Sequence, residues 1–267
     1  MTIALPLLRE GDGFDPADGY QDEVKLLQEK LSFPTDQIDG KFGNATRVAV
    51  ETLQRNMRLL ADGIVGENTW TAILGKPIQL LPRSTMIGSF DADKIIASIP
   101  FPNIRQFARH SVPIILRECL NSGIKTPAQI AYVLATAEHE SHLGELMEEL
   151  ASGWAYEGRQ DLGNDRPGDG PRFKGRGFVQ ITGRANYADW STRLGIDLIG
   201  QPERTAEPLI ASKILVRGMQ DGAFTGRRLS QFISPSSHDF VNARDIVNPG
   251  DRSAHIAAIA QEYLKVL

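Results

Sequence analysis

The stretch Thr126-Pro-Ala-Gln-Ile-Ala-Tyr-Val-Leu-Ala-Thr-Ala-Glu-His-Glu-Ser-His-Leu-Gly144 gives the strongest helix signal in the sequence. Thr126 is a suitable N-cap, Pro127 suits the first helical position, and Gln129 completes a capping box. Apolar residues then recur at helical spacing along one face, and Gly144 predicts the end of the helix. At about 100° per residue, Glu140 falls at the edge of this apolar face, where we expect its carboxyl group to be half-buried.

Further glutamates follow the predicted helix end, at positions 145, 148, 149 and 157. If the helix continued, Glu149 would lie on the side opposite Glu140, because nine residues make about two and a half turns. The break at Gly144 permits the chain to fold back, so that a second carboxylate can face the first. Two carboxyl groups in different environments are what the hydrolysis of a glycosidic bond requires.

A glycine-rich segment runs from Phe173 to Tyr187 and reads Phe-Lys-Gly-Arg-Gly-Phe-Val-Gln-Ile-Thr-Gly-Arg-Ala-Asn-Tyr. Gly175 and Gly177 allow a ligand to approach the backbone closely. Three polar side chains of the same segment suit a cleft that binds sugar hydroxyls and amides, namely Gln180, Thr182 and Asn186.

An internal repeat defines a first domain. The eight residues 39–46 recur at 62–69, at a period of 23 residues. Each copy reads as an Asp-Gly turn, one apolar anchor (Phe42 or Val65), and a glycine that leads into a helix. An earlier amphipathic helix spans residues 24–31. Together these patterns predict a small three-helix domain.

The chain as a whole is expected to be mainly α-helical, with few and short strands. We predict a first domain at residues 1–75, a proline-bounded linker at 76–90, and a larger α-rich domain at 91–267.

Residues 18–75 resemble the peptidoglycan-binding domain 1 family. Besides the two repeats, the sequence contains the Leu-Gln, Ala-Val and Thr-Trp elements of that family, at 27–28, 49–50 and 69–70. One departure is Leu53-Gln54, where Phe-Gln is common. The resemblance implies that this domain binds the cell wall and that the partner is bacterial peptidoglycan.

Residues 136–186 resemble the catalytic core of the family 19 glycoside hydrolases, which contains chitinases and phage endolysins. The stretch from Ala243 to Asn248 resembles the closing motif of that family. The short spacing between the acidic residues favours the endolysin branch. The resemblance implies a lysozyme-like catalytic domain and inverting hydrolysis of β-1,4 bonds between N-acetylated amino sugars.

The resemblance also implies roles for individual residues. Glu140 would protonate the leaving oxygen, and Thr182 would hold the attacking water. The spacing makes Glu149 the first choice for the base and Glu157 the second, whereas Glu145 and Glu148 are read as solvated charges. The candidate substrate contacts are Gln180, Asn186, Tyr187, Asn248 and Arg176. Of these, Tyr187 could instead pack and Arg176 could instead brace the core by an ion pair.

Composition restricts the partners. The chain has 29 Lys and Arg against 33 Asp and Glu, a net charge of −4, so no basic surface favours nucleic acid or membrane. The single cysteine, Cys119, excludes an internal disulfide and is read as a core residue. We expect a monomer that needs no metal or cofactor.

No stretch is typical of a membrane span or a signal peptide. Synthesis in a host cytoplasm, followed by release through a holin-type hole or a secretion device, is therefore expected.

Three alternatives stay open. The first is a chitinase that acts on N-acetylglucosamine polymers. The second is a zinc amidase or peptidase, which the pair His139 and His142 suggests. The zincin motif needs histidines four residues apart on one helix face, but position 143 is Leu. The third is a wall-binding protein without activity.

Overall fold

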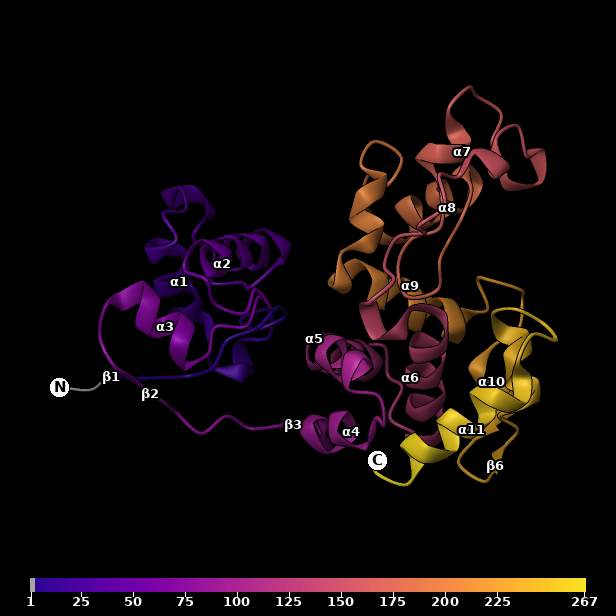
Figure 1. Cartoon of the computed structure of the whole chain (residues 1–267). Coiled ribbons are helices and arrows are strands. Elements are labelled where there is room, and N and C mark those ends of the chain that lie inside the picture. The colour runs from indigo at the N-terminus through magenta and orange to yellow at the C-terminus, as the bar shows by residue number, and fades with distance from the viewer. Residues whose placement is uncertain (1–2) are drawn as a thin grey trace. The chain divides into compact units, whose positions relative to one another are not determined.

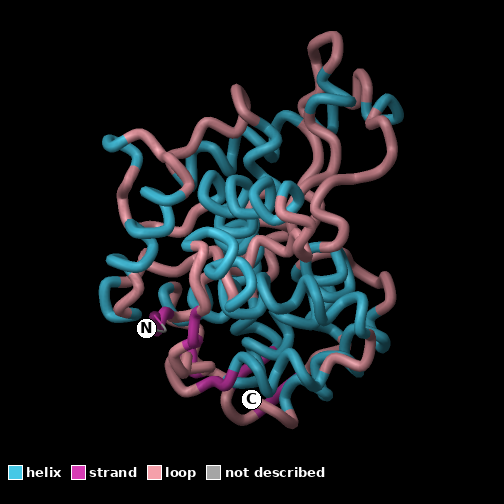
Figure 2. Tube along the Cα trace, turned by 60° about the vertical axis from the view of Figure 1, so that its left-hand side comes forward, coloured by secondary structure: helices cyan, strands magenta, loops and turns pink. Residues whose placement is uncertain are grey.

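The computed structural model describes residues 3–267 and has two compact units, one ending at Thr85 and the other beginning at Met86. Helices predominate in each unit (Figure 1), and the strands of the described residues are short and form three two-stranded sheets (Figure 2). The expectation of a mainly α protein is therefore confirmed. Within residues 3–267, no helix is both long and apolar enough to cross a lipid bilayer.

The first unit combines three α-helices with one parallel strand pair. Its elements are β1 (Ile3–Leu5), a 3₁₀ helix (Pro16–Asp18), α1 (Gln21–Lys30), a 3₁₀ helix (Thr35–Gln37), α2 (Asn44–Asn56), α3 (Glu67–Leu74) and β2 (Ile78–Leu80). β2 pairs with β1, with Ile78 opposite Ile3. This strand lies in the segment 76–90 that the sequence favours as a linker, so the first part of that segment belongs to the first unit.

The internal repeat is visible as two equivalent turns, each held by a buried glutamine. Gln28 donates from Nε2 to Asp39 Oδ1 (2.8 Å) and accepts from the Gly40 N–H (3.0 Å). Gln54 makes the equivalent bonds in the second copy, to Asp62 Oδ1 (3.1 Å) and from the Gly63 N–H (2.9 Å). Both apolar anchors of the repeat, Phe42 and Val65, are fully buried, as predicted. The two copies therefore share a turn and its brace, although the glutamine precedes the aspartate by 11 residues in the first copy and by 8 in the second.

The second unit contains the remaining elements. They are β3 (Met86–Ile87), β4 (Phe90–Asp91), α4 (Ala92–Ser98), α5 (Pro102–Asn121), α6 (Pro127–Ser141), α7 (Asp169–Arg172), α8 (Arg184–Leu194), α9 (Pro208–Asp221), α10 (Leu229–Phe232), β5 (Ile233–Ser234), β6 (Ser237–His238) and α11 (Ser253–Leu264). Five 3₁₀ helices join them, at His142–Gly144, Trp154–Tyr156, Gln160–Leu162, Pro202–Ala206 and Asn242–Ile246. The pairs β3–β4 and β5–β6 are antiparallel hairpins.

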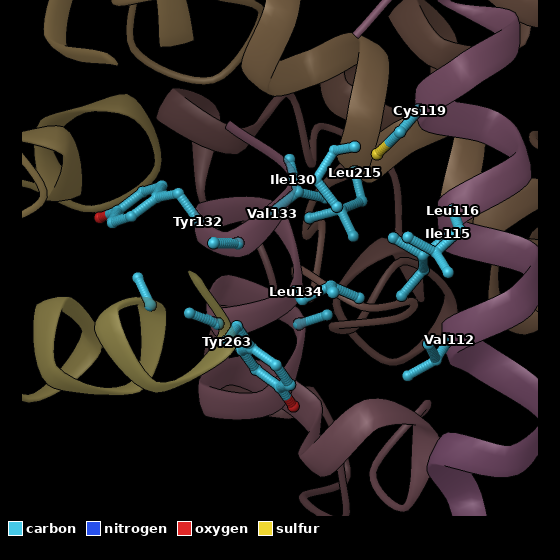
Figure 3. Close-up of a cluster of buried hydrophobic side chains, with 14 of the residues drawn as sticks. Val112, Ile115, Leu116, Cys119, Ile130, Tyr132, Val133, Leu134, Leu215 and Tyr263 are labelled. Atoms are coloured by element: carbon cyan, nitrogen blue, oxygen red, sulfur yellow. The ribbon is translucent and has the colours of Figure 1, made fainter. Parts of the chain in front are cut away.

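The helix α6 is the centre of this unit. It packs against α5, α9 and α11, and side chains from all four helices meet in one core (Figure 3). Cys119 of α5 is fully buried in this core, as predicted. The sequence favours one apolar face on α6, but every residue from Ile130 to Glu138 is buried. The prediction of a one-sided helix is wrong, because helices cover α6 on several sides.

Both ends of α6 also differ from the prediction. The helix begins at Pro127 after the N-cap Thr126, as expected, but the Thr126 side chain makes no capping bond. Gln129 does not complete a capping box, since its Nε2 donates to the Ile233 carbonyl (2.9 Å) across the core. The helix ends at Ser141 because His142 adopts a left-handed backbone (φ 48°), two residues before Gly144.

Candidate active site

Glu140 lies on the last turn of α6, with 19% of its side chain exposed. Its Oε1 accepts a hydrogen bond from Arg244 Nη1 (2.5 Å), which comes from the 3₁₀ helix Asn242–Ile246. Arg244 is only 2% exposed, and its Nε donates to the Asp251 carbonyl (2.9 Å). The carboxylate is thus held in one orientation by a buried, doubly anchored guanidinium. The sequence placed Arg244 in a motif but gave it no role.

Glu149 lies in the loop that follows α6, and its two carboxylate oxygens have separate donors. Tyr156 donates from its hydroxyl to Oε1 (2.9 Å), and the Gly175 N–H donates to Oε2 (3.1 Å). The Glu149 N–H in turn donates to the Gly175 carbonyl (2.9 Å), which fixes the loop to the glycine-rich segment. Partial burial and the bond to Glu149 raise the pKa of Tyr156, so this hydroxyl stays a donor at neutral pH. The role of Tyr156 was not found from the sequence.

Three of the predicted side chains converge beside Gly175. A Cβ atom at Gly175 would lie 2.9 Å from Gln180 Oε1, 3.3 Å from Glu149 Oε2 and 3.4 Å from Thr182 Oγ1. Three side-chain oxygens therefore surround one point, and only glycine leaves that point open. Gln180 adopts a left-handed backbone (φ 51°), a strained conformation that is typical of functional sites.

The remaining polar bonds order this segment. Thr182 donates from Oγ1 to the Gln180 carbonyl (3.0 Å), and Asn186 donates from Nδ2 to the Thr182 carbonyl (2.7 Å). Gln180 donates from Nε2 to the carbonyls of Leu146 (2.9 Å) and Gly177 (2.8 Å). The hydrogen bond from the Gln180 side chain to the Leu146 carbonyl thus connects the glycine-rich segment to the loop after α6.

Glu157 has a different environment from Glu149. Its Oε1 accepts from the Gly168 N–H (2.7 Å) and its Oε2 from the Gly170 N–H (2.9 Å). Both oxygens are used to brace the loop that leads into α7. This arrangement does not favour Glu157 as the base.

Glu148 and Glu145, which the sequence reads as solvated charges, are exposed residues that also have polar partners. Glu148 pairs with Lys174 Nζ (2.7 Å) and Arg176 Nε (2.9 Å). Desolvation acts to raise the pKa of Glu148, but the hydrogen bonds from Lys174 and Arg176 hold it below the ordinary value. Glu145 Oε2 lies 2.9 Å from Nδ1 of His142.

Two of the five expected substrate contacts lie beneath the surface. Tyr187 is fully buried, and its hydroxyl donates to the Lys174 carbonyl (2.7 Å). Arg176 is 7% exposed and donates from Nη1 to Tyr187 Oη (3.1 Å) as well as from Nε to Glu148. A fully buried ring has no surface to offer a sugar, so the expected contact by Tyr187 is corrected to a packing role. For Arg176, the geometry favours the bracing alternative.

Asn248 and Trp154 are accessible. Asn248 follows the 3₁₀ helix that carries Arg244, and its backbone N–H donates to the Arg244 carbonyl (3.1 Å). Asn248 is an exposed residue. Trp154 is 61% exposed, which leaves its ring free to stack on a sugar. For the zinc alternative, no group of three or more His, Cys, Asp or Glu side chains with the spacing of a metal site occurs in the described part of the chain.

The chain is similar to wall-binding and sugar-cleaving proteins. Residues 20–73 match the family model "Putative peptidoglycan binding domain", which confirms the first resemblance. A Haemophilus influenzae protein, described as a glycosyl hydrolase family 19 domain-containing protein, is 41% identical over 58 residues. That match covers 22% of this chain and 28% of the relative, so the chain spans less than a third of the relative it matches.

A crystal structure of a mutant of chitinase C superposes with a TM-score of 0.48 at 16% identity, over 67% of this chain and 93% of that one.

Proposed function

We propose that the protein is a peptidoglycan-degrading glycoside hydrolase that cleaves β-1,4 bonds between N-acetylated amino sugars. One observation carries the proposal: two carboxylates have distinct supports, Glu140 beside the buried Arg244 and Glu149 between Tyr156 and the Gly175 N–H. Hydrolysis of a glycosidic bond needs such a pair, because one group gives a proton and the other takes one.

Glu140 acts as the general acid. It protonates the glycosidic oxygen as the bond to the leaving sugar breaks. Arg244 fixes the position of the carboxyl group and stabilises the carboxylate that remains after proton transfer.

Glu149 acts as the general base. Its Oε2 lies next to the open point beside Gly175, which Thr182 Oγ1 and Gln180 Oε1 also border. A water at this point can give a proton to Glu149 while it attacks the anomeric carbon. The bonds from Tyr156 and Gly175 keep the carboxylate aimed at this water.

The first unit brings the enzyme to its substrate. Residues 20–73 match a peptidoglycan-binding family, and this match favours peptidoglycan over chitin as the natural polymer. A chitinase that cleaves N-acetylglucosamine polymers is the second candidate, since both polymers have the same linkage. The products of purified sacculi and of chitin oligomers, identified by mass spectrometry, distinguish the two. Release of muropeptides with a reducing muramic acid supports the proposal, whereas cleavage of chitin oligomers alone contradicts it.

A further inference from the structure

A cavity lies at the C-terminal end of α6. It has a volume of about 690 Å³ and is formed entirely by the second unit. Its walls come from the end of α4, the start of α5, the end of α6 and one face of α11. We call it the α6–α11 pocket. None of the residues that surround Gly175 lines it, so it is separate from the position of the attacking water.

One wall of this pocket is apolar. It is formed by Ile99 and Ile104 near the junction of α4 and α5 and by Ile259 on α11. Phe101 also lines the pocket and is 55% exposed, so its ring borders the opening. Such a wall suits aliphatic groups and excludes a fully hydrated ligand.

Other residues of the lining carry hydrogen-bond donors, namely His139, His142, His255 and Arg252. The rings of His139 and His255 meet edge to face, with centroids 5.6 Å apart. Burial lowers the pKa of His139, so at neutral pH this ring is uncharged and offers one N–H.

The acidic groups of the pocket already have partners. Glu138 accepts a hydrogen bond from the Tyr263 hydroxyl, and Glu262 pairs with Lys265 (2.6 Å). The Arg252 carbonyl accepts from the N–H groups of His255 and Ile256, whereas its guanidinium makes no hydrogen bond or ion pair with any residue between positions 3 and 267. The lining thus presents an unpaired guanidinium beside the imidazole rings.

The backbone at Arg252 is a second, independent observation. Arg252 has φ 51°, in the left-handed region that side chains other than Gly, Asn and Asp seldom adopt. Such a conformation costs free energy and persists where a local role requires it. Here it starts α11 while its side chain lines the pocket.

The pocket adjoins the proposed general acid. His139 precedes Glu140 in α6, and it interacts electrostatically with Glu140, Arg244 and Asp251. Arg252 follows Asp251, whose carbonyl anchors Arg244. The pocket therefore lies beside residues that adjoin Glu140 and Asp251 in sequence, which makes the sugar chain that Glu140 cleaves the source of its proposed occupant.

We propose that the α6–α11 pocket binds the short peptide that is attached to the muramic acid of peptidoglycan. Arg252 pairs with a carboxylate of this peptide, the imidazoles bind its amide groups, and the isoleucine wall receives its aliphatic side chains. A neutral amino sugar has no group that matches an unpaired arginine, so the pocket favours peptide-bearing glycan over chitin. The inference rests on the proposed glycosidase function and names the substrate class of that site.

The test uses the full-length protein and two forms of one polymer. Soluble glycan strands that keep their peptides are compared with strands from which an amidase has removed them. Arg252→Gly removes the guanidinium and tolerates the left-handed backbone. It should raise KM on peptide-bearing strands roughly tenfold, the scale of one lost charge-assisted hydrogen bond. KM on peptide-free strands should change less than about twofold.

Controls separate this effect from general damage. Arg193→Ala is the matched control, because it also removes an exposed arginine and because alanine, unlike glycine, suits a position inside α8. This variant should leave both KM values unchanged. If Arg252→Gly does not fold, His255→Ala replaces it and should show the same preference in a weaker form. Circular dichroism establishes folding for each variant.

A binding measurement keeps the pocket testable apart from catalysis. The free tetrapeptide L-Ala-γ-D-Glu-diaminopimelate-D-Ala should bind the wild type in calorimetry and bind Arg252→Gly at least about fivefold more weakly. Equal damage on both glycans, or no binding of the tetrapeptide to the wild type, overturns the inference. A wild type inactive on both glycans contradicts the proposed function instead, and the calorimetry then still decides whether the pocket binds the peptide.

Discussion

The Nη1 of Arg244 donates to Oε1 of Glu140 across 104 positions of sequence, and this bond joins the end of α6 to the 3₁₀ helix Asn242–Ile246. Arg244 is buried and also anchored on Asp251, so it behaves as a fixed part of the fold. The position of the proposed acid therefore depends on the last fifth of the chain as much as on its own helix.

Glu140→Gln removes the proton that the leaving oxygen needs. Turnover of peptidoglycan should fall by about 10² or more, the usual scale for a general acid. Folding should be nearly unchanged, because the amide can still accept from Arg244. The rate of reducing-end release and the melting temperature check both points. Glu145→Gln, at an exposed residue nearby, is the control. Near-normal turnover by a folded Glu140→Gln protein would remove Glu140 from the mechanism.

Arg244→Lys keeps a positive charge but loses the planar fork that reaches both Glu140 and Asp251. We expect kcat to fall at least about tenfold with a small change in KM, because orientation of the acid matters most in the transition state. Stability should fall by about 1–3 kcal/mol, the cost of hydrogen bonds lost at a buried group. Urea denaturation and steady-state kinetics measure the two effects. An unchanged kcat in the folded variant contradicts the positioning role.

Glu149→Gln and Glu157→Gln separate the two candidates for the base. Glu149→Gln should reduce kcat far more, since only Glu149 borders the point beside Thr182. Glu157→Gln should mainly destabilise the loop held through Gly168 and Gly170, by about 1–3 kcal/mol. Single-turnover rates and thermal melts distinguish these outcomes. The reverse order of damage to kcat moves the base to Glu157.

The stereochemistry of the first product reports on the mechanism. An inverting enzyme holds its two carboxyl groups roughly 6.5–9.5 Å apart to admit a water, whereas a retaining enzyme holds them about 5–5.5 Å apart. The chain leaves α6 at Ser141 and returns with Glu149 bonded to the glycine-rich segment, so the two carboxylates belong to separate segments. We expect an α-configured first product from a β-linked substrate. Proton NMR within the first turnovers checks this, and a β-configured product excludes inversion.

The two units should be separable in function. A fragment of residues 86–267 keeps the core around α6 and the whole proposed site, so it should fold and cleave soluble glycan strands. Its activity on intact sacculi should be lower than that of the full chain, because it lacks the peptidoglycan-binding match at 20–73. Turbidity assays on sacculi and product analysis on soluble strands make the comparison. Equal rates of fragment and full chain on sacculi contradict a targeting role for the first unit.

The sequence by itself determined the local elements and their chemistry. The two Asp-Gly turns with buried anchors Phe42 and Val65 and the helix that starts at Pro127 could be predicted. These features depend on residues close together in the chain, where turn geometry, helix periodicity and spacing act directly.

Tertiary structure alone decided which long-range partners these groups have. Periodicity gave α6 one apolar face, but packing buried it on several sides and drew Gln129 to the Ile233 carbonyl instead of a cap. No local pattern distinguishes Glu149 from Glu157, because their roles depend on which backbone N–H groups reach them, Gly175 or Gly168 and Gly170. The support of Glu140 by Arg244 likewise comes from packing of distant segments. Sequence spacing encodes the groups, and the fold sets the different environments of the proposed acid and the proposed base.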